Sequence, residues 1–281
     1  MVKQSDYPEE EVQACLSVLL EVMTALGKFR KNIAVVGGNV PFLLIPSSEP
    51  KHPGSLDVDI ALDFKHISSN EYETILRILE KRGYYQKPDG PPFRFYRDIK
   101  VSSGSIKTIP VDLLAGEYGG TGKGRRHQKV QDVKARKARG CDLVFDYAIE
   151  INLSGKLPNG GKNEVTVLVP HIGVFLVMKG MALWDRMNEK DAFDIYYCCR
   201  NYPGGLKELI EEMKALVTNK LAREGLGKIK AKFATVDAIG PTWVADFSET
   251  TEPEEKDRIQ REAFEIVNSV LDALGIKPVT E

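Results

Sequence analysis

Long hydrophobic runs and charge of one sign are both missing from this chain of 281 residues. No apolar run approaches the ~20 residues that a helix needs to cross a bilayer, so no membrane-spanning segment is expected. The acidic, polar N-terminal segment does not have the pattern of a signal peptide. The 39 basic and 40 acidic residues give a formal net charge of -1, so any attraction to nucleic acid or a membrane must be local.

Cysteine and histidine are scarce as well, with four of each. The cysteines form no C-x-x-C pair, and the vicinal pair Cys198-Cys199 falls in a predicted helix, while Cys15 and Cys141 stand alone. The histidines are scattered without the spacing of metal ligands. This pattern argues against a disulfide framework and a zinc ribbon, and it fits a reducing cytoplasm.

The composition that remains, 42% hydrophobic and 28% charged, is that of an ordinary globular protein of one large or two small domains. Apolar periodicity predicts strands at 33–36, 56–64, 93–101, 108–114, 141–153 and 164–169, and helices at 9–29, 68–82, 172–187, 189–201, 204–223 and 254–274. Ser68 and Glu71 form a capping box for the second helix. The sequence therefore predicts an α+β fold, with a mixed sheet and helices in residues 1–170 and a helical domain in residues 171–281.

Three carboxylates fall on predicted strands. Asp57 and Asp59 alternate with Val58, so they point the same way, about 6.5 to 7 Å apart along the strand. Two like charges held side by side gain from a cation between them, and oxygen ligands suit Mg²⁺ or Mn²⁺. Asp112 is a lone acid in an apolar strand, which is costly unless it is paired or bound to metal. We predict Asp57, Asp59 and Asp112 as metal ligands and catalytic residues.

A glycine pair, Gly37-Gly38, follows the strand 33–36, and Ser55 directly precedes the carboxylate strand. Glycine lets the backbone approach phosphate oxygens closely, and a helix starting after it would aim N–H groups at them. Alone, a Gly-Gly pair is usually a turn and an Asp-x-Asp strand is often a solvated face. Their combination is more specific, and it predicts Gly37, Gly38 and Ser55 as nucleotide-binding residues.

In this order the motifs resemble the nucleotidyltransferase superfamily, whose signature is Gly-Gly or Gly-Ser followed by hydrophobic-Asp-x-Asp-hydrophobic. The resemblance implies a nucleotidyltransferase-fold sheet in the N-terminal domain, NTP as substrate and Asp112 as the third carboxylate. One departure is the spacing, because eighteen residues separate Gly38 from Asp57 where about ten are usual. The extra residues, 45–53, have turn-forming composition, and we expect a loop insertion at the mouth of the site.

A second motif lies in the predicted helices 172–187 and 189–201. Lys179 with Lys190-Asp191-Ala192-Phe193-Asp194 resembles the AbiEii-type nucleotidyltransferases, which include toxins of toxin–antitoxin systems. The resemblance implies that Lys179 and Asp191 contact the nucleotide and that Lys179 and Asp194 are catalytic. The competing interpretations are that Lys179 is a surface lysine with a buried stem and that Asp191 is an acid in the first turn of a helix capped by Asn188.

The segment 121–140 is strongly basic, and the residues predicted to attract a phosphate-rich acceptor such as RNA are Lys123, Arg125, Arg126 and Lys129. The competing interpretation is a flexible solvated loop. Gly119 to Lys123 is not a P-loop, because Glu117 and Gly124 stand where that motif needs glycine and Ser or Thr.

These observations predict an Mg²⁺- or Mn²⁺-dependent enzyme that transfers a nucleoside monophosphate from an NTP to an acceptor hydroxyl. By resemblance the acceptor is a tRNA end, the enzyme a cytoplasmic toxin and its partner an antitoxin protein. Two alternatives stay open. The acceptor is a small molecule or a protein side chain, or the chain is a nucleotide-binding relative without activity.

Overall fold

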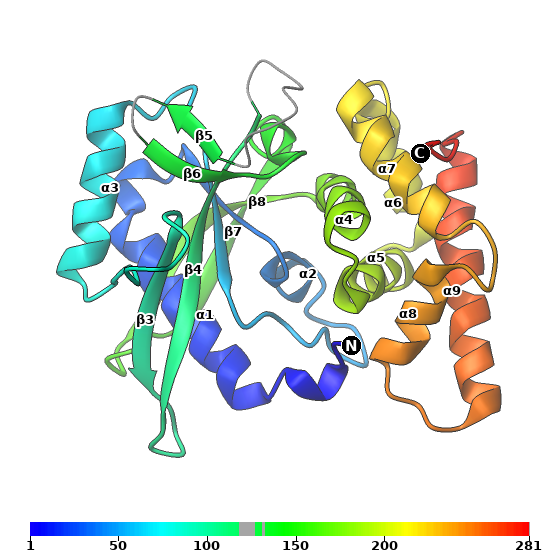
Figure 1. The fold of residues 1–281 in the computed structure, drawn as a ribbon, viewed down its shortest axis with the longest axis horizontal. Coiled ribbons are helices and arrows are strands. Elements are labelled where there is room, and N and C mark those ends of the chain that lie inside the picture. Colours follow the sequence, from blue (N-terminus) through cyan, green and yellow to red (C-terminus); the bar gives the residue numbers. More distant parts are fainter. Residues whose placement is uncertain (118–126, 131–132, 281) are drawn as a thin grey trace. The chain divides into compact units, whose positions relative to one another are not determined.

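The computed structural model describes residues 1–117, 127–130 and 133–280. The chain divides into two compact units. The sheet unit comprises residues 7–40 and 54–171, and the helical unit comprises residues 1–6, 41–53 and 172–281. The fold is α+β, as predicted, with a mixed sheet and flanking helices followed by C-terminal helices (Figure 1). The domain bounds 1–170 and 171–281 stay a prediction.

The sheet unit is built on eight strands in the described part of the chain, in the order β5-β6-β4-β2-β1-β8-β7, with β3 on β4. Their bounds are β1 (Ile33–Val36), β2 (Val58–Leu62), β3 (Arg94–Lys100), β4 (Ile106–Ala115), β5 (His127–Val130), β6 (Val133–Lys137), β7 (Ala148–Lys156) and β8 (Lys162–Pro170). Both parallel and antiparallel pairs occur: β2 runs parallel to β4, and β1 runs antiparallel to β2. β3 and β4 form the long hairpin seen in Figure 1.

Two helices of the sheet unit form where the sequence predicts them. α1 (Glu9–Ala25) buries Val18, Leu19 and Val22 and packs on β7, β8, β4 and β2. α3 (Ser69–Lys81) begins with the predicted capping box, because Ser68 Oγ accepts from Glu71 N (3.3 Å) while Glu71 Oε2 accepts from Ser68 N (2.9 Å). A capping box satisfies two backbone donors that the helix start leaves without partners.

The helical unit contains α4 (Ile172–Arg186), α5 (Glu189–Asn201), α6 (Leu206–Leu216), α7 (Lys220–Lys232), α8 (Ile239–Phe247) and α9 (Pro253–Ala273). Its closest helix contact joins α4 and α7. A Cβ added to Gly180 in α4 would lie 2.1 Å from the carbonyl oxygen of Gly225 in α7. Glycine at these positions therefore lets the two backbones meet.

The short helix α2 (Asn39–Leu44), which was not among the predicted helices, begins directly after Gly37-Gly38. Its first two residues belong to the sheet unit and its last four to the helical unit. The inserted segment 45–53 also belongs to the helical unit.

Two predicted elements are corrected by the structure, and two strands are added. The expected strand 141–153 begins only at Ala148, because Gly140 (φ 88°) turns the chain into a 3-10 helix at Cys141–Leu143. The expected helix 204–223 is two helices, since Asn219 Oδ1 accepts from Leu221 N (2.8 Å) and starts α7 there. The basic segment contains β5 and β6, two short strands that the sequence did not predict.

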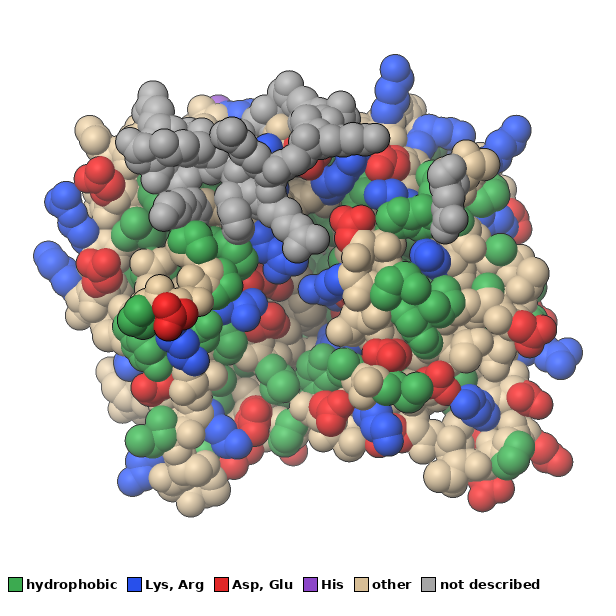
Figure 2. All heavy atoms as spheres, in the orientation of Figure 1, with side chains coloured by type: hydrophobic (Ala, Val, Ile, Leu, Met, Phe, Trp, Pro, Cys, Tyr) green, Lys and Arg blue, Asp and Glu red, His purple; other side chains and the backbone are tan. Residues whose placement is uncertain are grey.

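In the part of the chain that the structure describes, no helix is both long and apolar enough to span a membrane. Figure 2 shows basic and acidic side chains intermixed over the visible face. This distribution agrees with the near-zero net charge of the sequence.

Candidate active site

A row of charged side chains crosses three neighbouring strands of the sheet unit. Asp59 in β2 stands opposite Asp112 in β4, and Asp112 stands opposite Arg94 in β3. Residues paired directly across strands project from the same face of a sheet. Asp57 lies two residues before Asp59 and continues the row at the start of β2. The register thus brings Asp59 and Asp112 together and adds Arg94, while Asp57 directly precedes the first residue of β2.

The position of Asp57 is fixed by polar contacts within the sheet unit. Ser55 Oγ donates to Asp57 Oδ1 (2.7 Å), while Asn39 Nδ2 (3.0 Å) and Cys15 Sγ (3.2 Å) donate to the backbone oxygen of Asp57. Asn39 is fully buried. Burial, followed by the charge of Asp57, raises the pKa of the Cys15 thiol, which stays protonated. Sequence analysis missed Asn39 and Cys15, although the place of Asn39 directly after the glycine pair was an available signal.

Gly37 makes room for a carboxylate. Its φ is 71°, and a Cβ added there would lie 2.0 Å from Asp59 Oδ2. Any other residue would collide with Asp59 and be strained by its backbone angle. The sequence predicts Gly37 and Gly38 as phosphate-contacting residues, and that role stays a prediction. The structural role of Gly37 is to let Asp59 approach the end of β1.

Asp112 is held by an arginine. Its side chain is 1% exposed, and its two oxygens accept from Arg94 Nε (2.6 Å) and Nη2 (2.7 Å). Arg136 Nη1 lies 3.9 Å from Asp112 Oδ2. The hydrogen bonds to Asp112 raise the pKa of Arg94, which remains charged. The sequence shows Arg94 at the start of a predicted strand, but only the register reveals that it faces Asp112.

The donor atoms decide which of these residues fit a metal ion. Asp57 and Asp59 supply oxygen ligands of the kind that Mg²⁺ takes, and the Asp59 carboxylate fills the place where a side chain at position 37 would lie. Asp112 fits less well, since both of its oxygens are engaged by Arg94. Among the described residues, no three or more His, Cys, Asp or Glu side chains form a group that could hold an ion. Asp57 and Asp59 thus offer carboxylate oxygens to an ion, and their role as metal ligands stays a prediction.

The second predicted motif forms a buried charge cluster in the helical unit. Lys179 Nζ joins the two acids of α5, at 2.8 Å from Asp191 Oδ1 and 2.6 Å from Asp194 Oδ2. Arg186 donates two hydrogen bonds to the Asp191 carboxylate, from Nε to Oδ2 (2.6 Å) and from Nη2 to Oδ1 (2.7 Å). Lys190 Nζ lies 2.9 Å from Asp194 Oδ1. Lys179 is thus a buried, paired cation, which excludes the interpretation as a surface lysine.

His52, from the inserted segment, completes this cluster. Its Nε2 lies 2.9 Å from Asp194 Oδ1, and its ring contacts Tyr197 edge-on. Burial, helped by Lys190, lowers the pKa of His52 to about 4, so the ring is neutral at pH 7 and Nε2–H donates to Asp194. Sequence analysis missed His52, because an isolated histidine in a turn-rich segment carries no spacing signal.

The opposite charges in the cluster keep each other ionised although the groups are buried. Burial alone would raise the pKa of Asp194, but Lys179 and Lys190 lower it well below its usual range. Lys179 likewise has a raised pKa because Asp191 and Asp194 outweigh its burial. Burial lowers the pKa of Lys190. Asn188 Oδ1 accepts from Lys190 N (2.9 Å) and caps α5, as predicted. The catalytic and nucleotide-binding roles of Lys179, Asp191 and Asp194 stay predictions.

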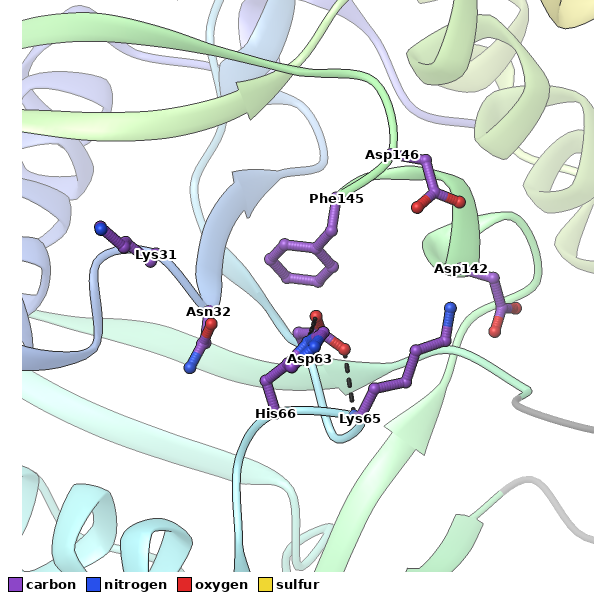
Figure 3. Close-up of a pocket in the computed structure, with 8 residues that line it drawn as sticks. All are labelled: Lys31, Asn32, Asp63, Lys65, His66, Asp142, Phe145 and Asp146. Carbon is purple, nitrogen blue, oxygen red and sulfur yellow. Dashed lines mark hydrogen bonds and ion pairs between the residues drawn. The ribbon is translucent and has the colours of Figure 1, made fainter.

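A separate cavity of about 280 Å³ lies in the sheet unit (Figure 3). It is lined by Lys31, Asn32, Asp63, Lys65, His66, Asp142, Phe145 and Asp146. His66 Nδ1 lies 2.6 Å from Asp63 Oδ2, and the figure shows the Lys65 ammonium directed toward Asp142. None of the predicted site residues is among the described residues that line it.

The residues predicted to contact RNA are placed only in part. Lys123, Arg125 and Arg126 lie outside the described residues, and Lys129 belongs to β5.

Comparison with known proteins gives one distant resemblance. No family model matches the chain, and no curated protein matches it. Among solved structures, the chain is similar to an antigenic nucleotidyltransferase-like protein from Paracoccidioides brasiliensis, with 15% sequence identity and a TM-score of 0.40. The match covers 97% of this chain and 95% of that one. So low a similarity leaves the family open, and the functional argument rests on the residues of the site.

Proposed function

We propose that the protein is a nucleotidyltransferase that moves a nucleoside monophosphate from an NTP to an acceptor hydroxyl. The observation that carries this proposal is the carboxylate pair Asp57 and Asp59, fixed by Ser55 and fitted against Gly37. A buried serine that orients one carboxylate and a glycine that admits the other preorganise oxygen ligands before any ion binds. Such a pair suits an Mg²⁺ or Mn²⁺ ion that also binds triphosphate oxygens.

The reaction proceeds by in-line displacement. The acceptor oxygen bonds to the α-phosphorus, the bond from that phosphorus to the bridging oxygen breaks, pyrophosphate leaves and the hydroxyl proton passes to water. The ion, when bound, supplies positive charge to the phosphate oxygens. Asp57 and Asp59 hold that ion, and Gly37, Gly38 and Ser55 shape the nucleotide side of the site. We also assign Asp112, on the neighbouring strand β4, to catalysis by resemblance. We assign Lys179 and Asp191 to nucleotide binding and Lys179 and Asp194 to catalysis, by resemblance.

For the acceptor we propose RNA, with a tRNA end as the specific candidate. The support is the basic segment 121–140, which stands out in a chain of net charge -1 and follows the strand of Asp112. The resemblance to AbiEii-type enzymes adds a toxin role with an antitoxin partner. A gene for a small DNA-binding protein directly beside this one would support that role.

The test is transfer of label from each of the four α-³²P NTPs, with Mg²⁺ or Mn²⁺, to total RNA and total protein. We expect labelling by the wild-type protein and none by Asp59→Asn. Asp63→Asn is the matched control, because Asp63 lies four residues on, outside the carboxylate row, and should label like wild type. Label that survives Asp59→Asn would contradict the proposal.

The same experiment separates the alternatives. RNase-sensitive product supports the RNA acceptor. RNase-resistant, protease-sensitive product supports a protein side chain, and labelled small molecules support the third class. Tight NTP binding without labelling, for all four bases, would indicate an inactive relative and would refute the enzyme.

A further inference from the structure

The Arg94–Asp112 pair changes how many ions the proposed site can take. We propose that the site takes one divalent cation, at Asp57 and Asp59, and that the Arg94 guanidinium, fixed by Asp112, supplies the second positive charge to the nucleotide phosphates. This inference rests on the proposed function and specifies the electrostatics of its site.

The first argument is geometric. Arg94 and Asp112 are register partners on adjacent strands, and the guanidinium meets both carboxylate oxygens at 2.6 and 2.7 Å. This is the fork geometry in which an arginine binds a carboxylate most tightly. A metal ion at Asp112 would have to share both carboxylate oxygens with that fork. Asp112 is therefore the anchor of a cation that the chain itself provides.

The second argument concerns the hydrogen-bond donors that remain. A guanidinium carries five N–H groups in a fixed plane. Asp112 accepts from two of them, and the other three donate to no side chain among the described residues. The Arg94 side chain is 29% exposed, whereas Asp112 is 1% exposed. The pair is thus buried at its acidic end and open at its basic end, as a phosphate-binding arginine requires.

The third argument is the charge balance of the row. Asp57, Asp59 and Asp112 face two guanidiniums, since Arg136 Nη1 lies 3.9 Å from Asp112 Oδ2. Arg136 stands opposite Leu114, two residues beyond Asp112 on β4, and so shares its face. These five groups leave one net negative charge, and a single divalent cation makes the row positive. A second cation would approach two arginines that cannot lose their protons.

The experiment counts bound ions. Mn²⁺ is titrated into the protein, with and without α,β-methylene NTP analogues, and free Mn²⁺ is followed by its paramagnetic resonance signal. We expect one Mn²⁺ per wild-type chain and none for Asp59→Asn. Asp112→Asn should still bind one, because Asp112 is not a ligand. Arg94→Met should weaken binding of the nucleotide analogue by about tenfold or more, and it should let a second Mn²⁺ bind at Asp112.

Arg97→Met is the matched control. Arg97 lies on the same strand but on the opposite face, where it pairs with Glu21 (3.0 Å). It should change neither ion number nor nucleotide affinity. If Arg94→Met does not fold, Arg94→Lys replaces it. Arg94→Lys keeps the charge without the fork, and it should bind one ion with an intermediate loss of nucleotide affinity.

Several results would overturn the inference. They are two Mn²⁺ ions per wild-type chain with the analogue bound, loss of Mn²⁺ in Asp112→Asn, or unchanged nucleotide affinity in the Arg94 variants. If the wild-type protein also labels acceptors, the proposed function stands while this inference fails. If the wild-type protein neither binds Mn²⁺ nor labels any acceptor, both this inference and the proposed function are wrong.

Discussion

At the scale of single residues, Gly37 ties backbone conformation to the carboxylate site. Its positive φ and the 2.0 Å approach of a Cβ to Asp59 Oδ2 mean that alanine there must displace Asp59. We expect Gly37→Ala to lower kcat/KM of nucleotide transfer about a hundredfold, the usual effect of a misplacement near 1 Å. Gly160→Ala is the control, because Gly160 also has a positive φ (87°) but no atom within 4 Å of the added Cβ. A similar loss in both variants would refute the steric explanation.

His52 makes stability depend on pH. Its pKa is about 4 in the folded chain against an ordinary 6.5, so between these values the unfolded chain binds a proton that the folded chain does not. The free energy of unfolding should therefore fall as the pH drops from 6.5 to 4, by roughly 3 kcal/mol. Asp194, whose pKa is lowered, adds its loss only at more acidic pH.

Urea unfolding at pH 7, 6, 5 and 4.5 measures this dependence. His52→Gln should flatten the slope over that window. His66→Gln, on a side chain that is 66% exposed, should retain it. An unchanged slope in His52→Gln would contradict the assignment.

Single residues were predictable where the signal was local. Ser68 and Glu71 sit at a fixed spacing, and the capping box they predict is present. Asp57 and Asp59 are recognisable from their alternation. The partners of these residues were not predictable, because Arg94 and His52 reach Asp112 and Asp194 across 18 and 142 residues of chain. Such contacts follow from strand register and tertiary packing, which no local pattern encodes.

At the scale of elements, the contact of α4 with α7 depends on two facing glycines. A Cβ on Gly180 would meet the Gly225 oxygen at 2.1 Å, and this neighbour is backbone that cannot rotate away. We expect Gly180→Ala to lower the free energy of unfolding by about 1–3 kcal/mol, although alanine favours an isolated helix. Thermal and urea unfolding measure the change.

Gly161→Ala is the control for that substitution, because its Cβ would have ordinary contacts at 3.4 Å. A stabilised Gly180→Ala variant would show that the helices separate without cost and would contradict the packing argument.

Predicted elements were confirmed where the apolar periodicity and the residues that start or stop an element agreed, as in β1, α3, α4 and α5. They failed where a turn interrupts a periodic run, as at Gly140 and Asn219. β5 and β6 were missed because they are only four and five residues long, too short for a clear periodic pattern. The order of strands in the sheet, which sets the carboxylate row, was beyond prediction from periodicity.

At the scale of the whole molecule, the helical unit is assembled from three stretches of chain. Residues 41–53 supply His52 to Asp194, and Ser48 bonds to Tyr197. A fragment of residues 172–281 would lose the His52 hydrogen bond to Asp194 and the Ser48 bond to Tyr197, and each buried polar group left without its bond costs about 1–3 kcal/mol. We expect amides of α4 and α5 to exchange hydrogen faster in that fragment than in the full chain.

The control is a full chain cut by protease at a site placed after His171. It retains residues 41–53 and should keep its protection. Equal protection in the fragment and the cut chain would show that the inserted segment is dispensable.

The path of the chain also limits how such a protein can be rearranged in evolution. The chain passes between the units four times, after residues 6, 40, 53 and 171. A single genetic crossover at position 171 would therefore join residues 172–281 of one relative to residues 41–53 of another, within one hydrophobic and ionic core. A recombination event that keeps each unit from a single parent would need further crossovers on both sides of residues 41–53. We therefore expect the two units to be inherited together.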